Sequence, residues 1–309
     1  MKTKVWAAML AIYIVWGSTY LAIHFAVETI PPFFMAGTRF LVSGLILYIW
    51  RRMSGDPAPT RRQWLSAIVV GVLLLLGGNG VLSWAEQKVA SGIAALIIAS
   101  IPLWIALIDA VRPHGIRPDW KLLLGLLIGF GGMILLITAS NAQRSQEGMS
   151  LIGLLALLLA AFLWSLGSIR GRDADMPASS LLSTGIEMLG GAGGLFLASA
   201  FLGEWRVLNL AAISTRSLLG LVYLIAAGSL VGFTSYSWLL RNAPVSLVST
   251  YAYVNPVVAI FLGAWLGGEV INLRIVVSAL VIIASVVVIN TSRGAKPEHR
   301  EATAPSVAD

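Results

Sequence analysis

The residues of this chain that could do chemistry are polar and aromatic side chains set inside long apolar runs. If these runs cross a bilayer, each polar group needs a partner inside the protein or in a water-filled cavity. Aromatic faces together with amides suit a ligand that is apolar at one end and polar at the other. We therefore predict that a substrate contacts Trp16, Tyr20, Asn79, Trp164, Tyr251, Tyr253 and Asn255. The alternative is that these residues only join packed helices.

Two charged residues also lie within apolar runs. Arg39 is about six residues, roughly 9 Å, from the nearer end of its run. Its side chain either snorkels to the lipid headgroups or faces a cavity and holds a carboxylate. Glu187 is too short to snorkel, so it is either a hydrogen-bonded structural acid or a coupling acid that exchanges a proton during transport. The two residues lie at different depths, and we expect no direct ion pair between them.

Prolines and charged residues elsewhere carry further predictions. Pro102 and Pro256 are predicted to break their helices at equivalent points and to act as hinges. Glu86 and Lys88 are expected at the membrane interface, with gating as the alternative. Glu269 is expected to cap the helix that follows it.

No catalytic centre is predicted. The chain has no cysteine, and its three histidines, His24, His114 and His299, are not at metal-ligand spacing. His24 is expected to be solvated near the end of its run. The chain lacks a G-x-S-x-G nucleophile motif and a G-x-x-x-x-G-K-[ST] phosphate loop. We therefore predict no enzyme activity, no metal and no cofactor, and transport driven by protons, exchange or the substrate gradient.

The composition indicates what kind of elements hold these residues. Hydrophobic residues make up 58% of the 309 positions and charged residues 11%, which is typical of a polytopic membrane protein. At about twenty apolar residues per crossing, we predict an all-α integral membrane protein with ten transmembrane helices. Their expected limits are 5–25, 33–50, 64–84, 91–111, 121–138, 150–169, 180–202, 217–240, 245–267 and 273–290. Residues 293–309 are predicted to form a disordered cytoplasmic tail.

The basic residues predict the orientation in the membrane. With the N terminus in the cytoplasm, fifteen Lys and Arg lie on the cytoplasmic side and five on the opposite side. This asymmetry predicts that both termini are cytoplasmic. The formal charge of +7 is spread over short loops, so it does not indicate nucleic-acid binding.

The two halves of the chain resemble each other. Adding 148 takes Trp16 to Trp164, Gly37 to Gly185 and Arg39 to Glu187, and adding 154 takes Gly78 to Gly232, Trp84 to Trp238 and Pro102 to Pro256. Each half has five helices, an odd number, so the second half enters the membrane from the opposite side. We predict two inverted five-helix repeats, at 1–140 and 141–292.

Three stretches carry a family resemblance. They are WGSTYLAIHFAVETIPPFFMAGTRFLVSG at 16–44, GNGVLSWAEQKVASGIAALIIASIPLW at 78–104 and TYAYVNPVVAIFLGAWLGGE at 250–269. They resemble the EamA-type drug/metabolite transporter superfamily, and the resemblance extends over all ten helices. It implies two inverted repeats around a central substrate cavity, and a basic residue at the position of Arg39.

These observations together predict a secondary transporter of the bacterial inner membrane. Its expected partners are membrane lipids, a small-molecule substrate and, as a further option, protons. It would export or exchange small metabolites, amino acids or drug-like solutes. The alternative is a flippase for lipids or lipid-linked substrates that uses the same fold.

Overall fold

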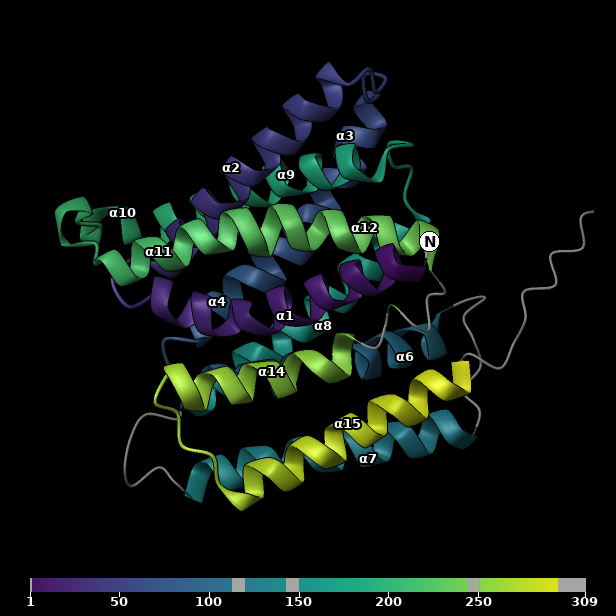
Figure 1. The fold of residues 1–309 in the computed structure, drawn as a ribbon, viewed down its shortest axis with the longest axis vertical. Helices are drawn as coiled ribbons and strands as arrows, with labels where there is room; N and C mark the ends of the chain where they lie inside the picture. The colour runs from purple at the N-terminus through teal and green to yellow at the C-terminus, as the bar shows by residue number, and fades with distance from the viewer. Residues whose placement is uncertain (1, 113–119, 143–149, 244–247, 249–250, 294–309) are drawn as a thin grey trace, which may run out of the picture.

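The protein is entirely helical in a computed structural model that describes residues 2–112, 120–142, 150–243, 248 and 251–293 (Figure 1). The first half consists of α1 (Lys2–Ala26), α2 (Pro32–Met53), α3 (Arg61–Gly71), the π-helix η1 (Val72–Gly80), α4 (Val81–Ala85), α5 (Ser91–Ile98), α6 (Ile101–Val111) and α7 (Trp120–Ala142). The third span is formed by α3, η1 and α4, and the fourth by α5 and α6.

The second half has the same order. It consists of α8 (Leu151–Asp173), α9 (Ser180–Phe201), the short α10 (Glu204–Val207) and η2 (Leu210–Ala212), α11 (Thr215–Tyr223), the π-helix η3 (Leu224–Val231), α12 (Gly232–Asn242), α14 (Tyr251–Leu266) and α15 (Leu273–Arg293). Here α11, η3 and α12 form one span, the counterpart of α3, η1 and α4. Six spans of the described chain are long and apolar enough to cross a membrane, and four shorter apolar helices accompany them.

The halves exchange their first helices. Helix α2 packs against its own counterpart α9, and α7 packs against its counterpart α15. By contrast, α1 packs against α11, α12 and α14 of the second half, while α8 packs against α3 to α6 of the first half. The helices of the two halves therefore form one interlocked bundle of ten spans in two inverted repeats, and the predicted fold class is confirmed.

The bundle has two ends. The N-terminal end holds Lys2, the loops at 54–60 and 174–179, and the last turn of α15. The distal end holds the connections at 27–31, 86–90, 202–214 and 267–272. Figure 1 shows the chain start and the end of α15 on one side, with α10 on the other.

The two prolines behave differently from each other. The fourth span, expected as a single helix, is interrupted after Ile98, and α6 begins only at Ile101. Pro102 lies in the first turn of α6, where its missing N–H leaves no helical hydrogen bond unmade. Pro256 instead lies inside α14, which continues through it. The prediction of equivalent breaks is therefore wrong for Pro256. Of the predicted tail at 293–309, Arg293 ends α15, and the rest lies outside the described residues.

Candidate substrate cavity

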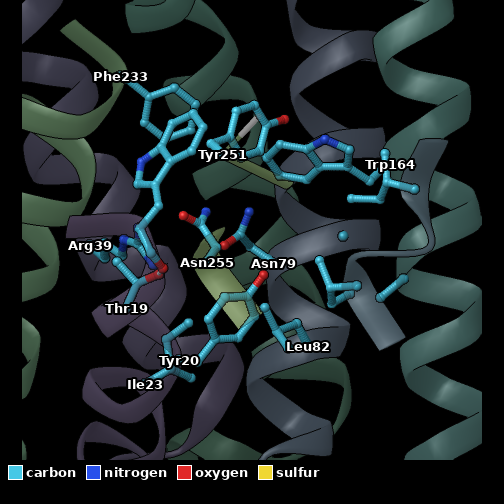
Figure 2. A pocket seen from close by; sticks show the side chains of 15 residues that line it. Thr19, Tyr20, Ile23, Arg39, Asn79, Leu82, Trp164, Phe233, Tyr251 and Asn255 are labelled. Atoms are coloured by element: carbon cyan, nitrogen blue, oxygen red, sulfur yellow. Dashed lines mark hydrogen bonds between the residues drawn. The ribbon is translucent and has the colours of Figure 1, made fainter. Parts of the chain in front are cut away.

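A cavity of about 100 Å³ lies in the middle of the bundle (Figure 2). One buried water needs at least about 10–15 Å³ of such space, so this cavity has room for several waters or a small solute. Both halves of the chain contribute to its wall. The lining residues are Trp16, Thr19, Tyr20, Ile23, Arg39, Gly78, Asn79, Leu82, Ile98, Ile101, Ala160, Trp164, Phe233, Tyr251 and Asn255.

Most of the residues predicted to bind substrate lie in this wall. They are Trp16, Tyr20, Asn79, Trp164, Tyr251 and Asn255, and Arg39 lies with them. Figure 2 shows Arg39 and Trp164 on opposite sides of the cavity, with the two asparagine amides between them. The side chain of Tyr253 lies outside the described residues.

The two tryptophans reach the cavity by the same local device. A Cβ at Gly232 would lie 2.3 Å from the Trp16 Nε1, and a Cβ at Gly78 would lie 2.8 Å from the Trp164 ring. Each tryptophan thus packs on a glycine of the opposite half, and the two pairs are related by the repeat. Only glycine leaves room for these rings, because any side chain would overlap them.

Trp16 also anchors a group of aromatic rings. Its ring centroid lies 5.4 Å from that of Phe233, 5.1 Å from Tyr236 and 5.2 Å from Tyr251. Its indole N–H donates to the carbonyl oxygen of Gly228 at 3.2 Å. This bond satisfies the polar group of a side chain that is otherwise apolar. The aromatic wall is therefore held in one orientation.

Arg39 does not reach a headgroup layer. Its side chain is only 4% exposed, and its Nε donates to the Ser229 hydroxyl at 2.9 Å. Its guanidinium carbon lies 4.7 Å from the centre of the Phe40 ring. Among the described residues no carboxylate forms an ion pair with it. A buried cation whose polar partner is a neutral hydroxyl leaves the cavity with positive charge.

The π-helical stretches explain how polar groups reach this point. Gly228 and Ser229 lie in η3, and Asn79 lies in η1, the equivalent stretch of the first half. A π-helix widens the backbone and is frequent at functional sites. Sequence reasoning found Asn79 but missed Ser229. The signal available for Ser229 was its place beside Gly228 inside an apolar run, which resembles the place of Asn79 beside Gly78.

Asn255 fixes the start of α14. With its amide nitrogen facing the carbonyl oxygens of Tyr13 and Tyr251, at 3.3 and 3.2 Å, it donates to both. It is 6% exposed, and the carbonyl of its own side chain remains for a ligand or water. Asn255 thus joins α1 to α14 beside the cavity.

Glu187 lies apart from the cavity wall. Its carboxylate accepts a hydrogen bond from the Ser183 hydroxyl at 3.0 Å. The described part of the chain holds no ion pair between Arg39 and Glu187, which agrees with the expected difference in depth. Pro102 and Pro256 are also absent from the lining.

The distal end differs from the predictions in two details. Glu86 lies in the connection after α4 but is completely buried by the protein. His24 is partly exposed, and its Nδ1 lies 3.0 Å from the Glu86 carbonyl oxygen. Glu269 does not cap the following helix, because Asn272 accepts from the Ile275 N–H there. Glu269 instead accepts from the N–H groups at the start of α5.

Two further features concern the charged residues. The Lys88 ammonium lies 5.1 Å from the centre of the Trp84 ring. The described residues contain no group of three or more His, Cys, Asp and Glu that could hold a metal ion.

An interlocked bundle of inverted repeats around a central cavity, with a few polar groups in its wall, is the architecture of a membrane transporter. The chain belongs to the EamA-like transporter family, whose model matches residues 3–138 and 151–291. It is therefore a multi-pass membrane transporter and not an enzyme.

Particular relatives can be named. The chain is 37% identical over 284 residues to the inner membrane transporter YedA of Escherichia coli K12, which covers 89% of each chain. It is 25% identical to a WAT1-related chloroplastic protein of Arabidopsis thaliana, over 94% of this chain and 70% of that one. It is 23% identical to the transporter YoaV of Bacillus subtilis, over 92% and 95%. A solved crystal structure shares the fold with a TM-score of 0.62 at 18% identity, over 94% and 99%. The relationship to YedA places the protein in the inner membrane.

Proposed function

We propose that this transporter exports or exchanges small amphipathic solutes across the bacterial inner membrane. The substrate class is metabolites, amino acids or drug-like solutes that carry a carboxylate. The observation that carries the proposal is Arg39, a buried cation in the cavity wall with a serine hydroxyl as its hydrogen-bond partner.

The rest of the wall fits such a solute. A substrate carboxylate beside Arg39 would compensate the buried charge and form charge-assisted hydrogen bonds. The rings of Trp16, Trp164 and Tyr251 would cover its apolar part. The amides of Asn79 and Asn255 would hold its remaining polar groups. A ligand with both characters uses the whole wall.

The proposed orientation puts both termini in the cytoplasm, so that the distal end faces the periplasm. The excess of Lys and Arg at the N-terminal end supports this orientation. Because the chain has no cysteine, single cysteines at each end can be labelled in intact cells with an impermeant maleimide. The proposed orientation predicts labelling of distal loops only. Labelling of an N-terminal-end loop, and not of a distal loop, would show that the orientation is the opposite one.

The test of the substrate site uses purified protein in proteoliposomes. Counterflow with labelled amino acids identifies a transported solute, and Arg39→Gln should then weaken its binding at least about 30-fold, because losing one partner of a buried charge pair costs about 2–5 kcal/mol. Arg39→Lys should restore part of the affinity, and Arg206→Gln, which changes an exposed arginine, should have no effect. Unchanged affinity in Arg39→Gln would refute the site. Movement of lipid probes alone would identify a flippase.

Glu187 keeps its proposed role as a coupling acid. Its position within a membrane span and its single serine partner support a group that changes protonation. Glu187→Gln should weaken the pH dependence of counterflow while the protein still folds. An unchanged pH dependence would exclude this role.

A further inference from the structure

The carboxyl group of Glu86 is the most unusual polar group of the distal end. It follows the last residue of α4, and its side chain is 0% exposed. Both of its oxygens are buried without a hydrogen-bond partner among the described residues. An ionised carboxylate in such a place would cost several kcal/mol, so burial favours the neutral form of the group.

Helix α1 supplies two of the groups that face Glu86. Tyr20 lies within electrostatic reach of the carboxyl and also lines the substrate cavity. His24 uses its Nδ1 on the backbone carbonyl of Glu86 at 3.0 Å, not on the carboxyl. Glu86 does not itself line the cavity, and α1 gives its carboxyl no cation.

The other charged groups nearby do not neutralise it either. Glu269, in the α14–α15 connection, lies within electrostatic reach and has the same sign. Lys88, in the same 86–90 connection as Glu86, holds its ammonium over the Trp84 ring. Arg216 of α11 pairs with Glu28 at 3.3 Å. Burial raises the pKa of Glu86 well above its ordinary value, and the charge of Glu269 raises it further, against a smaller lowering by the His24 backbone.

Apolar packing separates Glu86 from solvent. Ala85 and Val89, on either side of it in the chain, are 0% and 3% exposed. They belong to one buried cluster with Ala26, Val27 and Ile93 of neighbouring elements. Water can reach the carboxyl from this side only when the cluster separates.

We propose that Glu86 is the proton-binding site of a gate at the distal end. The closed gate keeps the carboxyl protonated, and opening lets it release one proton to the solution on that side. Closing requires that the proton be taken up again. This inference rests on the transport function and names a coupling device for it.

The sign of the pH dependence follows from these states. The closed gate binds the proton more tightly than the open gate, so acid stabilises the closed state. Raising the pH through the pKa of buried Glu86 destabilises the closed state and favours opening. Solutes on the distal side therefore meet an open gate more often in alkaline solution.

The test measures opening without any substrate. A cysteine introduced by Val27→Cys lies in the closed cluster, since Val27 is 4% exposed. A cysteine introduced by Leu210→Cys serves as the reference, since Leu210 is 70% exposed at the same end. The ratio of their maleimide labelling rates removes the pH dependence of the thiol itself. The ratio should rise by up to about tenfold per pH unit, as release of one proton requires.

Variants assign the proton to Glu86. Glu86→Gln should keep the ratio low at every pH, because the gate then has a permanently neutral group. Glu86→Asp, which still titrates, should keep a pH-dependent ratio, and Arg206→Gln, which changes an exposed residue of the same end, should leave the profile unchanged. A ratio that is flat in the protein with Glu86, or a profile that survives in Glu86→Gln, overturns the proposal. If the protein with Glu86 shows the expected pH-dependent labelling ratio but no counterflow of any tested solute, the result counts against the proposed function and not against the gate.

Discussion

The two ends of the bundle hold its halves together in different ways. Inside the bundle, toward the N-terminal end, α2 and α3 meet α9 backbone to backbone. A Cβ at Gly71 would lie 2.0 Å from the Glu187 carbonyl oxygen, and a Cβ at Gly44 would lie 3.0 Å from the Gly185 carbonyl oxygen. Helices α2 and α3 therefore touch α9 directly, and this contact is steric. Toward the distal end, α11 also approaches α1, where a Cβ at Gly220 would lie 2.9 Å from the Ala22 carbonyl oxygen.

At the distal end carboxylates of the second half cap helices of the first. Glu204 accepts from the backbone N–H groups of Phe33 and Phe34, at 3.2 and 2.9 Å, where α2 begins. Glu269 accepts from the N–H groups of Ser91 and Gly92, at 2.6 and 3.0 Å, where α5 begins. Charge at a helix N terminus is stabilising because the free N–H groups there carry partial positive charge.

The position of Glu204 has a repeat counterpart at the N-terminal end. Subtracting 148 from Glu204 gives Asp56, which pairs with Arg51 at 2.7 Å and hydrogen-bonds Ser179, the N-cap of α9. The position keeps its capping role, but there it acts through a serine and a partner arginine. The contacts of α2 and α3 with α9 are steric, whereas the caps of α2 and α5 depend on single carboxylates, so the two kinds of contact should respond to different substitutions.

The largest effect should come from breaking the steric end. Gly71→Ala pushes a methyl group into the α9 backbone, which should destabilise the protein by about 3 kcal/mol, the upper end for overpacking. Thermal unfolding in detergent, followed by loss of the monodisperse peak, measures this. Gly193→Ala is the matched control, because nothing lies within 4 Å of a Cβ there. Equal stability of the two variants would contradict the backbone contact.

Removing a distal carboxylate should cost less. Glu269→Ala deletes three hydrogen bonds and the cap of α5, which should destabilise the protein by about 2 kcal/mol. Glu204→Ala, with two bonds, should follow with about 1–2 kcal/mol. The same unfolding assay measures both, with Glu28→Ala as the control acid of this end. A smaller effect than that of the control would show that the caps do not hold the halves together.

Acid should weaken the Asp56 contacts of the N-terminal end. Hydrogen bonds from Arg51 and Ser179 lower the pKa of Asp56 to about 2. Its stabilising effect is therefore complete above the ordinary aspartate value of about 3.9 and disappears as the pH falls through about 2. The unfolding midpoints of the wild type and Asp56→Asn should differ at neutral pH and converge only in strong acid. Convergence in mild acid would contradict the lowered pKa of Asp56.

The smallest effect belongs to the exposed ion pairs of the N-terminal end. Arg62 and Asp175 lie 3.7 Å apart, with 84% and 43% of their side chains exposed. Solvent screens such a pair, so Arg62→Gln should change the free energy of unfolding by no more than about 0.5 kcal/mol. A larger loss would mean that surface charge also holds this end.

Local patterns in the sequence predicted much of the architecture. Apolar length and the two repeat offsets predicted ten spans in inverted halves, which the fold and the family match confirm. Polar residues inside apolar runs also pointed to the side chains that line the cavity, because membrane burial makes such residues conspicuous. Arg39 was conspicuous for the same reason, although the sequence left open whether its side chain faces the lipid headgroups or the cavity.

Contacts between distant segments could not be read in this way. Glu269 caps a helix 178 residues earlier in the chain, whereas local spacing suggested the next helix. Glu86 is in a short connecting stretch that looks interfacial, and only the packing of α1 and α5 around it buries it. The break after Ile98 and the two π-helices depend on backbone geometry that no residue type uniquely marks.

The hydrogen bond between Arg39 and Ser229 has a consequence for how the protein is made. The two residues are 190 positions apart, so at about 5–20 residues per second the ribosome needs roughly 10–40 s to deliver the partner. During that time α2 has its arginine in the membrane without Ser229, and the start of α2 lacks Glu204. The first half is thus an unfinished assembly that later synthesis completes. A chain that stops after residue 140 should be recognised and degraded by membrane proteases.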